Sequence, residues 1–239
     1  MSAKQEYAAI WNKCMQLSHE YIKKGEAYRQ NVDGDTQSQN ETEQFCLNAR
    51  YLHRGFYCPS PDMEYIITNM RRGTIAKRLN SAKNITNRYV FHADGRMKIA
   101  ETINLNGHIS TEHIFYQNNT VWGVTFERAS DMSKRVCEVS VEEYADEKIR
   151  SYLWATCNYN SNKDQYTIWQ IIYEEYHYGN EGYLETDFYY MSPSSVPEWD
   201  HICQYQKYRF HLDGNGGVIP KSKEMRDKGT VCVNPFEKQ

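Results

Sequence analysis

The chain has 239 residues, a formal net charge of -3 at pH 7 and 25% charged residues, with a mean hydropathy of -0.83. This length favours one large domain, and the slight acidity argues against general binding to the nucleic-acid backbone, which needs concentrated Lys and Arg. No apolar run approaches the roughly 18 residues that cross a bilayer, and the first residues lack the apolar core of a signal peptide. We therefore expect a single cytoplasmic domain over 1–239, with no membrane partner and with its seven cysteines reduced.

Residues 2–24 predict an amphipathic helix. Apolar side chains recur there at steps of three and four residues, and Lys23, Lys24 and Gly25 supply the expected ending. The apolar stripe consists of Tyr7, Ile10, Trp11, Cys14, Leu17, Tyr21 and Ile22. Because each large side chain that leaves water contributes about 1.5 to 3 kcal/mol, we expect this helix to lie on an apolar surface.

Residues 25–44 predict a polar loop, since their composition is too polar to offset the entropy of ordering them. Its DGDT stretch resembles the start of a calcium loop, but Ser38 and Gln44 stand where such a loop needs Gly and Glu. A second, shorter helix is expected over 61–72, with Ser60 as N-cap candidate. The basic stretch that continues to Arg88 is most simply a solvated face.

From residue 88 onward, turn signals predict a β-meander. Asp94-Gly95, Asn106-Gly107 and Asn118-Asn119 each follow the last by twelve residues, and such pairs tolerate the positive φ of a hairpin turn. Later strands are expected at about 135–143, 148–159, 165–178, 182–191 and 203–212. The expected fold class is α+β, mainly β: an antiparallel meander of eight to nine strands over 88–214. We expect this sheet to be strongly twisted or barrel-like, with the N-terminal helix packed on it and an irregular tail over 215–239.

Two similar heptapeptides occur in the chain, YVFHADG at 89–95 and YRFHLDG at 208–214. Each copy reads as an aromatic strand that runs into a hairpin turn, because turn chemistry alone explains the Asp-Gly pair. A shared site of histidine and aspartate is the alternative. If the sheet closed around a small-molecule pocket, we expect His92, His211, Trp122 and Trp169 to line it.

The hairpin over 165–191 is acidic and rich in tyrosine, and it is the strongest candidate for a binding surface. Tyrosine supplies contact area at low entropic cost, and carboxylates steer a basic partner. The candidate binding residues are Tyr173, Glu174, Glu175, Tyr176, His177, Tyr178, Glu185, Asp187 and Tyr189. Two alternatives stay open: a carboxylate dyad for acid and base work, and tyrosines that belong to the core.

Motifs of catalysis and cofactor binding are missing from the sequence. HISTEH at 108–113 has the wrong spacing for the helical zinc motifs, and no phosphate loop, dinucleotide fingerprint or nucleophile elbow is present. We expect no catalytic residues, no metal and no cofactor, although an enzyme remains the alternative to a binding protein.

The meander with its Y-x-F-x-x-D-G turns and the segment NGHISTEHIFYQNNTVWGVTFE resembles the small β-sheet proteins that bacteria encode as immunity partners of secreted toxins. The resemblance covers about 88–214. It implies an inhibitor without catalysis that occludes a toxin or other cationic protein, and nucleic acid is not an expected partner. The other reading is a small-molecule-binding barrel or enzyme.

Overall fold

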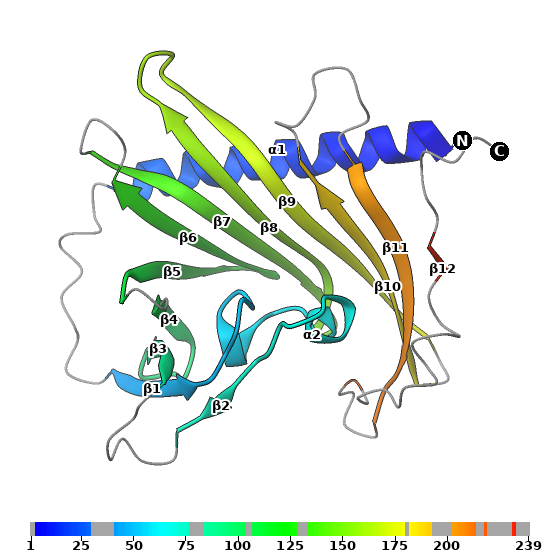
Figure 1. Cartoon of the computed structure of the whole chain (residues 1–239), viewed down its shortest axis with the longest axis horizontal. Coiled ribbons are helices and arrows are strands. Elements are labelled where there is room, and N and C mark those ends of the chain that lie inside the picture. Colours follow the sequence, from blue (N-terminus) through cyan, green and yellow to red (C-terminus); the bar gives the residue numbers. More distant parts are fainter. Residues whose placement is uncertain are drawn as a thin grey trace.

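The computed structural model describes residues 3–29, 41–76, 84–103, 107–128, 133–179, 182–192, 202–213, 218 and 231–232. Within these ranges the strands form one antiparallel sheet of 12 strands, in the order β12-β11-β10-β9-β8-β7-β6-β5-β4-β3-β1-β2. From β3 to β12 each strand therefore pairs with its neighbours in sequence, which is the predicted meander (Figure 1).

The elements are α1 (Ala3–Arg29), β1 (Thr42–Leu47), η2 (Gly55–Tyr57), α2 (Met63–Ile66), β2 (Thr74–Ile75), β3 (Ile85–Phe91), β4 (Met97–Ile103), β5 (Ile109–Gln117), β6 (Thr120–Arg128), β7 (Lys134–Ala145), β8 (Lys148–Asn160), β9 (Gln165–Tyr178), β10 (Tyr183–Met191), β11 (Ile202–His211) and β12 (Val231–Cys232).

The turns of the meander lie where the sequence predicts them. Gly95 has φ 83°, Gly107 has φ 76° and Asn118 has φ 52°, and each stands between two paired strands. The strand count is higher than the predicted eight to nine, because β1, β2 and the two-residue β12 add to the meander. The described sheet is also open, with β12 and β2 outermost, so the expectation of closure into a barrel is wrong for these strands.

α1 packs on one face of the sheet, which we call the helix face, and crosses behind the strands in Figure 1. Cys14, Tyr21 and Ile22 are buried there, as the apolar stripe predicts. The helix does not end at Gly25 but continues to Arg29. A Cβ on Gly25 would lie 2.7 Å from a methyl of Val124, so this glycine permits close packing on the sheet.

Residues 48–73, the anchor segment, cover the opposite face, where they carry η2 and α2 (Figure 1). The predicted helix over 61–72 is shortened to α2, because the chain turns extended at Ile67 and the backbone of Arg71 pairs with Arg50. The predicted cap is present in part, since the Ser60 hydroxyl accepts a hydrogen bond from the Met63 N–H at 3.0 Å.

The sheet curves around the anchor segment. Tyr57 contacts Tyr89 on β3 with ring centroids 4.8 Å apart, and eight residues later Tyr65 contacts Phe210 on β11 at 6.3 Å. Figure 1 shows the strands from β3 to β11 arranged in an arc around this segment. The curvature brings distant strands against one short stretch of chain. No helix in the described ranges is long and apolar enough to cross a membrane.

Candidate functional site

The predicted binding residues of the β9–β10 hairpin divide between the two faces of the sheet, because side chains alternate along a strand. Those on the helix face are Tyr173, Glu175, His177, Glu185, Asp187 and Tyr189, which lie opposite one another in register. Those on the opposite face are Glu174, Tyr176 and Tyr178. The structure therefore does not bring the nine residues together in one surface.

Three tyrosines on the helix face form a row across neighbouring strands. Tyr173, Tyr189 and Tyr205 are aligned in register, and the rings of Tyr189 and Tyr205 stack at 4.8 Å. The N-terminal half of α1 covers them, with the Tyr7 ring 5.6 Å from that of Tyr205. Tyr173 and Tyr189 are buried, as is Tyr176 on the other face. The alternative that tyrosines of this hairpin belong to the core therefore holds for Tyr173, Tyr176 and Tyr189.

Beyond this row the helix face carries eight side chains that we call the β9–β11 patch. Its members are Glu175, His177, Tyr183, Glu185, Asp187, Lys207, Arg209 and His211. They stand in register, as a row with Glu175, Asp187 and Lys207, a row with His177, Glu185 and Arg209, and the pair Tyr183 and His211. Three rigid strands therefore present charged and aromatic groups side by side.

Asp187 is the buried centre of this patch. Its Oδ2 lies 2.9 Å from Nε2 of His177, and its Oδ1 accepts a hydrogen bond from the Tyr205 hydroxyl at 2.7 Å and lies 3.5 Å from Nζ of Lys207. The imidazole and the ammonium are half exposed. The carboxylate is therefore satisfied by partners within the chain.

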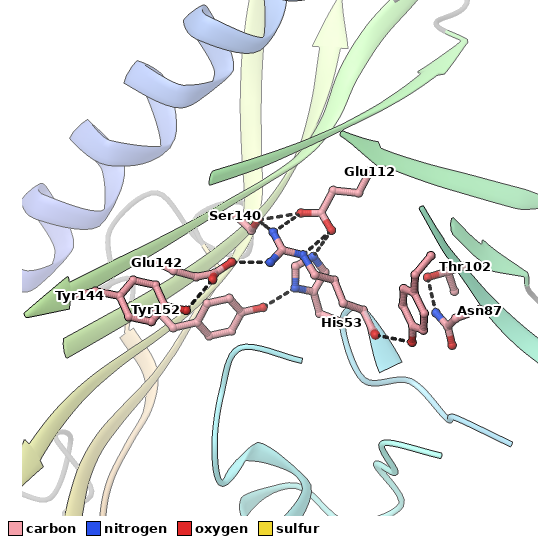
Figure 2. Close-up of polar contacts among 10 residues, drawn as sticks. His53, Asn87, Thr102, Glu112, Ser140, Glu142, Tyr144 and Tyr152 are labelled. Carbon is pink, nitrogen blue, oxygen red and sulfur yellow. Dashed lines mark hydrogen bonds and ion pairs between the residues drawn. The ribbon is translucent and has the colours of Figure 1, made fainter. Parts of the chain in front are cut away.

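The opposite face holds a buried ionic cluster around Arg54, whose partners Glu112 and Glu142 are labelled in Figure 2. The Arg54 guanidinium binds Glu112 through two hydrogen bonds of 2.7 and 2.8 Å, and a third nitrogen binds Glu142. The Ser140 hydroxyl donates to Glu112 at 2.7 Å, and the Tyr144 hydroxyl donates to Glu142 at 3.0 Å. The two carboxylates come from β5 and β7, so one guanidinium ties the anchor segment to two strands.

Local backbone geometry places the guanidinium of Arg54. The residue has φ 57°, a left-handed conformation that costs a non-glycine residue free energy. Its carbonyl oxygen accepts a hydrogen bond from the Tyr89 hydroxyl at 2.8 Å. Gly123 makes room on the sheet, because a Cβ there would lie 1.8 Å from the Glu112 carboxylate. A strained turn and a glycine thus both serve the same ion pair.

His53 extends the cluster. Its Nε2 lies 3.1 Å from Glu112 and its Nδ1 lies 2.6 Å from the Tyr152 hydroxyl, so a neutral ring can donate to the carboxylate and accept from the phenol. Burial opposes ionisation of Glu112, yet Arg54 and His53 hold its pKa well below the usual range. The carboxylate therefore stays charged, and its charge is balanced by the guanidinium.

A second polar anchor lies further along the same segment. Asp62 and Glu174 are fully buried and share the Ser60 hydroxyl, which lies 3.2 Å from Asp62 and 2.7 Å from Glu174. Thr186 donates to Asp62, and Tyr176 donates to Glu174. Burial, together with the Asp62 charge, raises the pKa of Glu174 to about 8, and burial raises that of Asp62 to about 6. Near neutral pH the pair therefore holds a proton.

The residues of the predicted pocket do not converge. Trp122 is buried beneath α1, where it stacks on Phe115 at 4.2 Å, whereas Trp169 is exposed on β9. His92 closes the β3–β4 turn, and the His211 ring lies 4.3 Å from Tyr183 at the end of β11. The two heptapeptides thus belong to strands with seven others between them in the sheet. The Gly214 of the second copy lies outside the described residues.

Reasoning from sequence missed the Arg54 cluster. On β7 Ser140 and Glu142 alternate with buried valines, which is the usual pattern of a strand with one face in water. The one local hint was Arg54-Gly55 in a stretch of apolar residues. Among the residues that the structure describes, no group of three or more His, Cys, Asp or Glu could hold a metal ion.

No family model and no curated protein matches this sequence. Among solved structures, the chain is similar to a protein of unknown function, BF3112, from Bacteroides fragilis NCTC 9343. The two are 11% identical, and the alignment covers 56% of this chain and 98% of the other with a TM-score of 0.32.

Proposed function

We propose that this chain is a cytoplasmic protein-binding module that docks a basic partner protein on the β9–β11 patch. The observation that carries the proposal is the register-matched set of charged and aromatic side chains on three paired strands. Side chains on strands are held more firmly than side chains on loops, so little entropy is lost when a partner binds. The resemblance to immunity proteins implies that binding occludes the partner's active surface.

Glu185 is the most exposed carboxylate of the patch and is available to a basic partner, although it has a neighbour. Glu185 lies 3.5 Å from Arg209, and their side chains are 41% and 55% exposed. Such an exposed ion pair contributes about 0 to 1 kcal/mol, so a cationic side chain from a partner can replace Arg209 at little cost. Arg209 would then remain over the Tyr183 ring, where it now lies 4.3 Å from the centroid.

The test uses the purified chain and the purified product of the adjacent gene, with affinity measured by calorimetry at two salt concentrations. We expect binding that weakens with salt, because the contact is between opposite charges. Glu185→Arg should lower the affinity at least tenfold. Co-expression with a toxic neighbour product should also protect growth in the wild type and fail in this variant.

Glu20→Arg is the matched control, since Glu20 is a half-exposed carboxylate on α1 that pairs with Lys24 at 2.8 Å. It should leave the affinity within twofold. Equal affinity of wild type and Glu185→Arg would remove the patch from the proposal. Failure to bind the neighbour product, together with turnover of a small molecule, would overturn the proposal as a whole.

A further inference from the structure

Residues 58–70 of the anchor segment, which we call the strap, lie on the sheet between two fixed ends. Before the strap, the Arg54 guanidinium is bound to two buried carboxylates of the sheet. After it, the backbones of Arg50 and Arg71 exchange two hydrogen bonds of 2.9 and 3.0 Å. The strap adds no strand to the sheet in the described part of the chain. It can therefore leave the sheet while its ends and the meander stay in place.

The strap also has a shape of its own, which Arg72 maintains. The Arg72 guanidinium donates hydrogen bonds to the carbonyl oxygens of Cys58, at 2.8 Å, and Ser60. The same guanidinium pairs with Glu64 at 3.0 Å. These contacts lie within the anchor segment, so they bind the strap to itself and leave its attachment to the sheet to other groups.

The polar attachment of the strap to the sheet runs through two buried carboxyl groups, Asp62 and Glu174, which we call the carboxyl pair. Thr186 on β10 donates to Asp62, and the Ser60 hydroxyl lies 2.7 Å from Glu174 and 3.2 Å from Asp62. A serine hydroxyl has one proton and can donate to one of the two, so its contact with the other requires a proton on a carboxyl group. No ion pair in the described part of the chain reaches either carboxyl group, and Oε1 of Glu174 is buried without a hydrogen bond.

The other groups around the carboxyl pair do not titrate near neutral pH. Those that face it are Cys58 and Arg72 of the anchor segment, Tyr152 of β8, and Tyr176 and Tyr178 of β9. Burial raises the pKa of the thiol to about 12 and raises the pKa of each phenol from its ordinary 10, so these groups keep their protons. The Arg72 charge favours ionisation of the pair, but burial outweighs it.

We propose that the carboxyl pair is a pH-dependent latch, which holds the strap on the sheet while it keeps its proton and releases the strap in alkaline solution. Loss of the proton puts two negative charges in one desolvated place without a paired cation, and release of the strap returns both to water. Because the pKa of Glu174 is raised to about 8, the hold on the strap is lost as pH rises through that value. The latch lies on the face opposite the β9–β11 patch, so it is independent of the proposed docking of a basic partner.

The experiment measures how fast iodoacetamide labels Cys58 in the full chain between pH 6 and pH 9, with each cysteine peptide resolved by mass spectrometry. Cys58 is a buried free thiol between the strap and the sheet, whereas Cys14 is a buried free thiol beneath α1 on the helix face. The ratio of the two rates removes the general effect of pH on thiols and the effect of global unfolding. We expect this ratio to rise at least tenfold from pH 6 to pH 9.

Glu174→Gln replaces the titrating group by a neutral amide of the same shape, so its ratio should change less than about twofold over the same range. Glu185→Gln removes an exposed carboxylate from β10 and is the control that should keep the full rise. A constant ratio in the wild type would overturn the inference by itself, whether or not the variants fold. A full rise in Glu174→Gln would do so as well, because release would then not depend on this proton.

Discussion

The anchor segment is fixed to the sheet at two buried polar points, and they differ in how their charge is balanced. At Arg54 a fixed cation holds two carboxylates, with two hydrogen bonds to Glu112 and one to Glu142. At Asp62 and Glu174 two carboxyl groups share a serine hydroxyl, and a proton takes the place of the cation. The charge balance at the first anchor depends on the Arg54 side chain, whereas the charge balance at the second depends on bound protons and therefore on pH.

The comparison shows two solutions to the same problem, the burial of acidic groups beneath a covering segment. A paired carboxylate gains from its cation only while both are present, since removal of one leaves an uncompensated buried charge. A protonated carboxyl avoids that cost but remains stable only while the solution can supply the proton. The two anchors should therefore fail at opposite ends of the pH scale.

The largest effect is expected for Arg54→Leu. It leaves Glu112 and Glu142 buried without their cation, at a cost of about 3 to 5 kcal/mol in the free energy of unfolding. Arg209→Leu makes the same chemical change in an exposed ion pair and should cost under about 1 kcal/mol. Urea unfolding of both variants measures the difference.

If Arg54→Leu does not fold, Arg54→Lys keeps the charge and loses the planar fork, and should still cost more than Arg209→Lys. Equal losses at positions 54 and 209 would contradict the assignment of Arg54 as an anchor.

The next effect is the pH dependence of the second anchor. The ordinary pKa is 3.8 for Asp62 and 4.5 for Glu174, and the folded state raises these pKa values to about 6 and about 8. The folded state thus binds more protons than the unfolded state between these limits, so the free energy of unfolding falls as pH rises through them. The pKa of Glu112 is lowered instead, so its contribution is present above its ordinary 4.5 and is lost in acid.

Urea unfolding from pH 5.5 to 8.5 should show this decline in the wild type. Glu174→Gln keeps the hydrogen-bonding shape without the titration, so its stability should change much less over the same range. Glu185→Gln removes an exposed carboxylate and should keep the wild-type slope. An undiminished slope in Glu174→Gln would mean that other groups carry the pH dependence.

The smallest of the three effects is steric. Gly123→Ala places a Cβ 1.8 Å from the Glu112 carboxylate, which must move away from Arg54 or force the strand aside. We expect a loss of about 1 to 3 kcal/mol, as for other overpacked cores. Gly179→Ala is the control, because its nearest neighbours would lie 3.8 Å away. A Gly123→Ala variant as stable as the wild type would show that the ion pair can shift without cost.

The sequence predicts the meander well because its signals are local. The strand predicted at 165–178 matches β9 in both bounds, and the turns at Gly95, Gly107 and Asn118 have the positive φ that their residue types favour. The contacts of a hairpin join residues that are close in sequence. Alternating apolar and polar residues with a two-residue turn signal between them are therefore sufficient to predict its place.

The anchors could not be predicted in this way. The partners of Arg54 lie 58 and 88 residues away in sequence. They are buried because the anchor segment covers the face of the sheet that carries them. In the sequence alone, Glu112 and Glu142 fit the pattern of strands whose polar face is exposed to solvent. The burial of Tyr173 and Tyr189 could not be predicted for the same reason. α1 covers both side chains, and no pattern in the local sequence indicates this contact.

Strand order also has a consequence for synthesis on the ribosome. Residue 54 emerges long before Glu142, and Ser60 precedes its partner Glu174 by 114 residues. The anchor segment must therefore stay exposed to water while the later hairpins of the sheet are synthesised and form. Its docking closes loops of more than a hundred residues, so the nascent chain completes this part of its interior only after β9 has been translated.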